Sequence, residues 1–99
     1  MNKQQRAERI ITAVAATAGV DPVVLVRTHR TKHTPYRDRM TYLLDEIGLS
    51  RTEIAGIFQW ANPTNGLHAI RRVIKRMQAD TDEAQIITEL RREINAWAL

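Results

Sequence analysis

The chain has 99 residues, a net charge of +4, 43% hydrophobic residues and 26% charged residues, which suits one small folded domain and excludes a disordered chain. It has no cysteine, so disulfides and thiolate metal sites are excluded and a cytoplasmic protein is expected. The first ten residues have no apolar segment behind their charges, and no apolar run approaches the ~18 residues of a membrane span. Neither a secretory signal nor a membrane location is therefore expected.

Apolar residues recur at helical spacing along nearly the whole chain. The first predicted helix has its apolar face between Ile10 and Ala18 and ends at Gly19, a typical C-cap. Asp21 and Pro22 supply an N-cap followed by a proline at the first helical position. They open a short second helix with the sequence VVLVRT.

A basic loop is predicted at residues 29–34 (HRTKHT), which contain no apolar side chain. Pro35 then opens a third helix that ends at Gly48. A capping box of the form S-x-x-E begins a fourth helix over residues 50–58. The apolar face of the third helix consists of Met40, Leu43, Leu44 and Ile47.

Two longer helices complete the chain. Asn62 and Pro63 open the fifth, residues 63–77, and Asp80 or Thr81 caps the sixth, residues 81–97. The sixth has an apolar stripe made of Ile86, Ile87, Leu90, Ile94 and Trp97. No alternating strand pattern competes, so the sequence predicts an all-α fold: a single domain over residues 1–99, built as a bundle of about six helices.

Positive charge is concentrated in the middle of the chain. Residues 27–76 hold ten Lys or Arg against four Asp or Glu, whereas residues 80–99 hold two against five. An anionic partner, most often nucleic acid, is the usual reason for a basic centre, although a solvated surface has the same composition.

The fourth and fifth helices together have the form of a helix-turn-helix. In that motif the first helix crosses the DNA backbone, and the N-terminal turn of the second enters the major groove. Side chains at this tip must be short and able to hydrogen-bond base edges. The candidate base-reading residues are Asn62, Thr64, Asn65 and His68.

The fifth helix becomes basic one turn after its start and has no acidic residue before Asp80. Cations there would lie near phosphates and add affinity without sequence information. The candidates for backbone contacts on the two motif helices are Arg51, Arg71, Arg72 and Lys75.

Helix pairs of this form also occur in bundles that never touch DNA. Gly66 inside a helix costs ~1 kcal/mol relative to alanine, and either a close approach to DNA or packing against a neighbour explains it. Trp60 in the turn either fills the core, which we favour, or stacks on sugar or base. Trp97 is expected in the core.

Three ordered stretches resemble the C-terminal DNA-binding domain of the bacterial replication initiator DnaA. They are IITAVAATAGVDPVVLV, HRTKHTPYRDRMTYLLDEIGLSRTEIAGIF and GLHAIRRV, and they lie within residues 10–77. The resemblance implies a Trp-repressor-like helix-turn-helix fold that binds double-stranded DNA. It also implies a basic loop that enters the minor groove, with Arg30 and Lys32 as candidates there and Arg37 and Arg39 on the following turn.

The reading surface departs from that family. The family has Gly-Gly-Arg-Asp-His-Thr-Thr before its Leu-His-Ala, whereas residues 59–65 read QWANPTN. Only Thr64 matches, together with His68 in the next turn, so we expect the family's own DNA box not to be recognised. The chain has no room for the family's nucleotide-binding module and no Gly-rich phosphate loop. Neither ATP-driven activity nor a cofactor is therefore expected.

The leading hypothesis is a sequence-specific double-stranded DNA-binding protein that acts by occupancy. It would be a transcription regulator or replication accessory, and a phage, prophage or plasmid origin suits a reading head without a motor. The alternative is a protein-interaction module that binds a host initiator or replisome protein, which the altered reading surface and the acidic last helix favour.

No enzyme and no metal site are expected. No acids and histidines are grouped as a catalytic dyad or triad, and His29 and His33 more plausibly add titratable charge near phosphates than bind metal. The sixth helix either closes the core of a monomer, which we favour, or pairs with a second copy in a homodimer.

Overall fold

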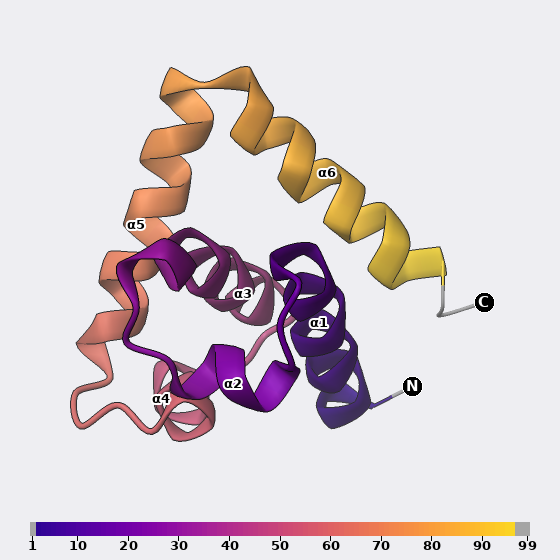
Figure 1. The fold of residues 1–99 in the computed structure, drawn as a ribbon. Coiled ribbons are helices and arrows are strands. Elements are labelled where there is room, and N and C mark those ends of the chain that lie inside the picture. Colours follow the sequence, from indigo (N-terminus) through magenta and orange to yellow (C-terminus); the bar gives the residue numbers. More distant parts are fainter. Residues whose placement is uncertain (1, 97–99) are drawn as a thin grey trace.

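The computed structural model describes residues 2–96, and these fold into helices without any strand. The all-α prediction is confirmed, with six α-helices and one 3₁₀ turn (Figure 1). The elements are α1 (Lys3–Ala18), α2 (Pro22–Arg27), η1 (Thr31–His33), α3 (Thr34–Glu46), α4 (Arg51–Phe58), α5 (Thr64–Ala79) and α6 (Thr81–Ala96).

The predicted helix boundaries follow from local capping. Gly19 ends α1 in the left-handed region with a φ of 70°, and the Asp21 carboxylate accepts the Val23 N–H at 2.9 Å at the start of α2. Before α4, the Ser50 hydroxyl accepts the Glu53 N–H at 3.1 Å, and the Glu53 carboxylate accepts the Ser50 N–H at 2.9 Å. These reciprocal bonds confirm the predicted capping box.

The predicted basic loop is more ordered than its composition indicates. Thr31–His33 form a 3₁₀ turn, and α3 begins directly after it at Thr34. His33 is buried, with 7% of its surface exposed, so the expectation that it adds charge near phosphates is wrong. His29, Arg30 and Lys32 remain exposed.

The core forms around α3, which packs against α1 on one side and α5 on the other. Met40, Leu43 and Leu44 are all buried, as the apolar face of the third helix predicts. The same core takes in fully buried side chains from five other helices: Ile10, Val14, Leu25, Ile54, Val73 and Ile87. The described residues therefore share one hydrophobic core.

The last helix, α6, packs against both α1 and α5. Figure 1 shows α5 and α6 as two arms that meet at one corner, with α6 running from the end of α5 across to α1. Ile87 and Leu90 of α6 are buried, and Ile86 and Ile94 pack at the edge of the core. The predicted stripe is confirmed at these four positions, while Trp97 lies outside the described residues.

Candidate nucleic-acid interface

The turn between α4 and α5 is held by aromatic stacking. The ring of Trp60 stacks on that of Phe58, with centroids 4.5 Å apart and planes 10° from parallel. Gln59 turns the chain in the left-handed region at a φ of 58°, and the Trp60 N–H donates to the Ala55 carbonyl at 2.9 Å. Trp60 thus packs against the core beneath the turn, the position that we favoured.

One exposed row runs along α5 from its N-terminal tip. Thr64, His68, Arg71 and Lys75 follow one another at intervals of four, three and four residues, so they share one face of the helix. All four side chains are exposed. The row begins with groups that can hydrogen-bond base edges and continues with cations, which is the order that a groove-entering helix requires.

Asn62 and Asn65 have different surroundings. The Asn62 side-chain oxygen accepts the Thr64 N–H at 3.0 Å, so Asn62 caps the first turn of α5. A bidentate contact with adenine needs both the oxygen and the nitrogen of the amide. Asn65 is exposed, its side chain has no hydrogen-bond partner among residues 2–96, and it is therefore the better candidate for such a contact.

The basic segment before α3 lies beside this tip. Thr34 at the start of α3 and Asn65 at the start of α5 line the same hollow, so the end of the basic segment lies near the tip of α5. The structure thus brings together the two basic regions that the sequence singles out. Across the described part of the chain, no hydrogen bond or ion pair engages the side chains of Arg30, Lys32, Arg71 and Lys75.

Three other arginines are paired with two buried carboxylates. Asp38 and Glu83 each have only 3% of their side-chain surface exposed. Arg72 binds Asp38 through two hydrogen bonds of 2.8 and 2.9 Å, and Arg39 binds Glu83 at 2.6 and 3.3 Å. Arg76 bridges both acids, at 3.1 Å to Asp38 and 2.6 Å to Glu83. We call these five residues the carboxylate cluster.

The carboxylate cluster joins α3, α5 and α6 through these ion pairs. Burial opposes ionisation of Glu83, but hydrogen bonds from Arg39 and Arg76 outweigh that effect and lower its pKa. The hydrogen bond to Asp38 raises the pKa of Arg72. Arg39 has only 14% of its side chain exposed, and its charge is paired with Glu83 inside the cluster. Arg72 has 50% of its side chain exposed and still reaches the surface.

Arg51 and Gly66 form a packing contact between the two motif helices. A Cβ added to Gly66 would lie 3.4 Å from Cδ of Arg51 and 3.8 Å from both Thr41 and Trp60. Gly66 is buried, but these distances are ordinary van der Waals contacts, so the packing leaves room for a Cβ and does not by itself require glycine at this position. The Arg51 guanidinium lies 3.5 Å from the Asp45 carboxylate, with 39% of its side chain exposed.

Arg37 is stacked rather than paired. Its guanidinium carbon lies 5.2 Å from the centre of the Phe58 ring, and its Nε is shielded from solvent without a hydrogen-bond partner. Burial lowers the pKa of Arg37, while the charge of Asp38 partly offsets that effect. Arg37 therefore differs from the other candidates in being a partly desolvated cation without a counter-ion.

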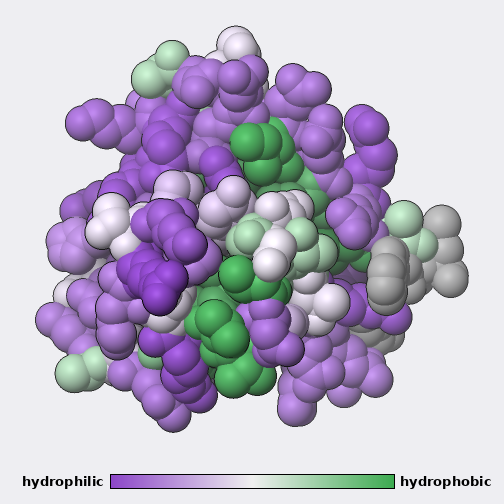
Figure 2. Space-filling model, in the orientation of Figure 1, coloured by the Kyte–Doolittle hydropathy of each residue, from purple (hydrophilic) through white to green (hydrophobic). Residues whose placement is uncertain are grey.

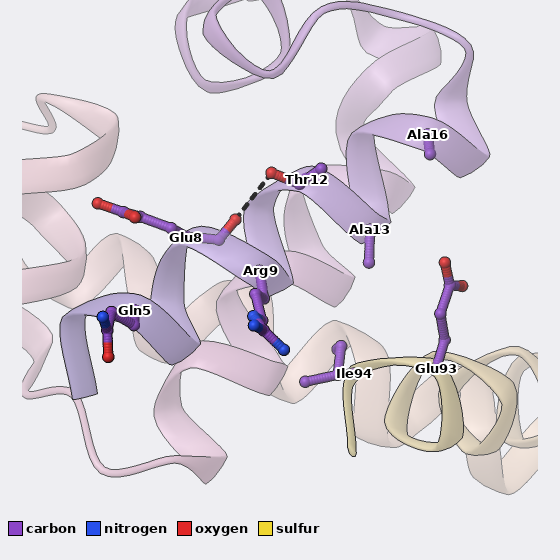
Figure 3. A pocket seen from close by; sticks show the side chains of 8 residues that line it. All are labelled: Gln5, Glu8, Arg9, Thr12, Ala13, Ala16, Glu93 and Ile94. Carbon is purple, nitrogen blue, oxygen red and sulfur yellow. Dashed lines mark hydrogen bonds between the residues drawn. The ribbon is translucent and has the colours of Figure 1, made fainter. Parts of the chain in front are cut away.

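Two other surface features lie outside this region. A groove of about 660 Å³ separates α1 from α6, and Figure 3 shows Ala13 and Ala16 on one wall and Ile94 and Glu93 on the other. In Figure 2, hydrophobic surface extends from the position of α2 toward the gap between α5 and α6. Val23 and Val24 of α2 are 67% and 51% exposed.

Metal and membrane features are absent from the described residues. Between residues 2 and 96, no three His, Cys, Asp or Glu side chains are grouped so that they could hold a metal ion. No helix in that range is long and apolar enough to cross a membrane.

The carboxylate cluster was not predicted from the sequence. By their pattern, Arg39 and Arg72 are candidates for contacts with DNA, whereas the structure pairs both with buried acids. The available indication was the spacing of Arg72 and Arg76, one turn apart on one helix face. Nothing local identifies Asp38 or Glu83 as their partners, since 34 to 44 residues separate most of the paired side chains.

No protein-family model, no curated protein and no solved structure matches the chain. The resemblance to the initiator's DNA-binding domain therefore stays a prediction from the sequence.

Proposed function

We propose that the protein binds double-stranded DNA in a sequence-specific manner, with the tip of α5 in the major groove. The observation that carries this proposal is the exposed row on α5, where Thr64 and His68 precede Arg71 and Lys75. Asn65 lies beside this row, and Arg30 and Lys32 extend the basic surface from the segment before α3. Phosphate contacts from the cations would position the helix, and the tip side chains would read bases.

The arrangement of charge supports this orientation. α6 carries most of the C-terminal acids and joins α5 at the end opposite to the tip, ~24 Å along the helix axis. Its one buried acid, Glu83, is neutralised by Arg39 and Arg76. DNA at the tip of α5 would therefore meet unpaired cations rather than carboxylates.

We place the protein in the cytoplasm as a regulator or replication accessory that acts by occupying its site. The ordered resemblance to the initiator's DNA-binding domain supports the same role. The altered residues 59–65 support a target other than the family's box.

Selection of bound sequences from random duplexes tests the proposal most directly. We expect a defined motif to be enriched, and we expect its affinity to fall steeply between 50 and 200 mM salt, as it does for proteins that neutralise several phosphates. Arg71→Gln should weaken every duplex, whereas Arg92→Gln on α6, which removes the same charge, should leave affinity unchanged. Failure to retain any duplex at low salt would contradict the proposal.

A protein-interaction module is the second candidate, and the exposed valines favour it. Val23 and Val24 are adjacent on α2 and largely solvent-exposed, and Figure 2 shows hydrophobic surface at this position. Exposed apolar patches of this kind often bind proteins. If this candidate is correct, Val23→Ser with Val24→Ser abolishes capture of an initiator or replisome protein, and the parent protein retains no DNA.

A further inference from the structure

A hollow of about 270 Å³ lies between the start of α3 and the start of α5. Its walls come from α3, from α5 and from the turn between α4 and α5, and they carry mainly hydrogen-bonding or cationic groups. The residues that matter for its chemistry are Thr34, Arg37, Trp60, Asn65, His68 and Arg72. This hollow opens beside the tip of α5, where the exposed row begins.

Arg37 is the unusual member of this group. Its guanidinium lies over the Phe58 ring, which stacks in turn on Trp60, so the cation is held in place without an ion pair. Its Nε is removed from solvent and has no hydrogen-bond partner within residues 2–96. The Nε itself is too enclosed for a ligand to reach, so an anion in the hollow would meet the outer nitrogens of the Arg37 guanidinium and would offset the cost of a partly desolvated, unpaired cation.

The one carboxylate at the hollow does not fill that role. Asp38 already accepts three hydrogen bonds of 2.8 to 3.1 Å from Arg72 and Arg76. Its side chain is 3% exposed, so it presents little negative surface to a ligand. Arg72 covers it and is itself half exposed at the rim. The open part of the hollow is therefore bounded by donors rather than by acids.

We propose that this hollow binds one phosphate oxyanion, with Arg37 as the main donor and His68 and Arg72 at its rim. The assignment of that oxyanion to a backbone phosphate of bound DNA rests on the proposed function. A phosphate held there would fix α5 against the DNA backbone and so set the register in which Thr64 meets a base edge. Arginine suits this role because its planar donors match phosphate oxygens in pairs.

Inorganic phosphate is the probe that tests the hollow without DNA. We expect a titration followed by ¹H–¹⁵N NMR to shift the signals of Thr34, Trp60, Asn65 and His68 in a saturable manner, whereas sodium chloride at equal ionic strength does not. Arg37→Gln should weaken phosphate binding by about tenfold or more, since hydrogen bonds to charged groups are the strong ones. Arg92→Gln removes the same charge from α6 and should have no effect.

Two further variants guard against loss of folding. Arg37→Lys keeps a cation over Phe58 but loses the planar fork, and it should bind phosphate with intermediate affinity. His68→Ala changes an exposed side chain and should weaken phosphate binding in a protein that keeps the parent's dispersed spectrum. Unchanged phosphate affinity in Arg37→Gln, or in both His68→Ala and Arg37→Lys if Arg37→Gln does not fold, would overturn the proposal.

Titration with a short duplex identifies the source of the phosphate. Displacement of bound inorganic phosphate by the duplex, with parallel loss of both affinities in Arg37→Gln, supports a DNA backbone contact. Phosphate binding without any duplex binding would contradict the proposed function and leave the anion site standing. Duplex binding that is indifferent to Arg37 would overturn the assignment to DNA, although the protein would still be a DNA-binding protein.

Discussion

Asn65 lies where the two proposed DNA contacts, base reading and backbone binding, meet. Asn65 comes directly after Thr64, the first residue of the exposed row, and it lines the hollow beside Arg37. Its amide can therefore face either a base edge or a phosphate. Its side chain makes no hydrogen bond within residues 2–96, and it is exposed. Its replacement should therefore change DNA recognition without changing the stability of the fold.

We predict that Asn65→Ala reduces discrimination between the selected site and a scrambled site by ~1–3 kcal/mol, while non-specific affinity changes less. Competition binding with the two duplexes measures this difference. Gln78→Ala, which removes an exposed amide near the other end of α5, is the matched control and should change neither affinity. Equal loss of specific and non-specific binding would instead make Asn65 a phosphate contact.

Gln59 is the one non-glycine residue with a positive φ among residues 2–96. The left-handed conformation costs a side-chain-bearing residue ~1–2 kcal/mol, and glycine avoids that strain but loses ~0.4–1 kcal/mol through its more flexible unfolded chain. We predict that Gln59→Gly raises the free energy of unfolding by about 0.5–1 kcal/mol, measured by urea denaturation. Gln59→Ala keeps the strain and should give no such gain.

At the scale of elements, α3, α5 and α6 are held together by charge as well as by apolar packing. The carboxylate cluster places two buried acids between three helices, with Arg76 bonded to both. Removal of one partner from such an arrangement leaves buried cations without an anion. The cluster therefore couples the position of α5, the proposed reading helix, to α6.

We predict that Glu83→Gln lowers the free energy of unfolding by about 2–3 kcal/mol. This loss is smaller than that expected on breaking a fully buried ion pair, because Arg76 is 31% exposed and retains its ion pair with Asp38. The pKa of Glu83 lies below its ordinary value of 4.5, so its stabilisation is complete above that value. The stabilisation is lost as the pH falls through the folded-state pKa. Denaturation at several pH values should show a flatter acid limb in the variant. Glu89→Gln, an exposed change on the same helix, should match the parent.

The segment before α3 acts as a second element of the proposed interface. Arg30 and Lys32 are exposed and form no ion pair within the described range, and η1 with the buried His33 fixes the chain that carries them. We predict that Arg30→Glu with Lys32→Glu weakens binding to all duplexes and reduces the salt slope by about 0.9 for each lost phosphate contact. Affinities at several salt concentrations measure the slope.

The double variant Arg6→Glu with Arg92→Glu carries the same change in net charge on α1 and α6, and it should keep a slope near that of the parent. If both double variants lose the same slope, the effect comes from overall charge, and the segment makes no specific contact.

At the scale of the whole molecule, the features that can be predicted from the sequence are those determined by residues close together in the chain. Helix ends are fixed at Gly19, Asp21 and the Ser50–Glu53 box by hydrogen bonds between residues two to four positions apart. These helix ends can therefore be predicted directly from the sequence. The apolar periodicity in the same way predicts the buried faces of α3 and α6. Neither depends on how the helices meet.

The remaining features depend on contacts between distant segments. Burial of His33, stacking of Arg37 on Phe58 and the pairing of Arg39 with Glu83 arise only when helices distant in the chain meet. An arginine has the same local pattern whether it faces solvent, a ring or a carboxylate. The eight predicted backbone cations could therefore not be divided from the sequence into exposed, stacked and paired groups.

The role of α6 is decided at this same scale. Its buried Ile87 and Leu90 complete the core over α1 and α5, and its Glu83 neutralises Arg39 and Arg76. We predict that truncation after Asp80 abolishes cooperative unfolding, because a small domain has little other core to retain. Leu90→Ala should destabilise the full chain by ~2–5 kcal/mol, and the exposed change Thr88→Ala should not. Melting and sedimentation velocity measure both effects: a monomeric parent that loses its fold supports closure of the core, and a dimeric parent that becomes a folded monomer makes α6 a dimer contact.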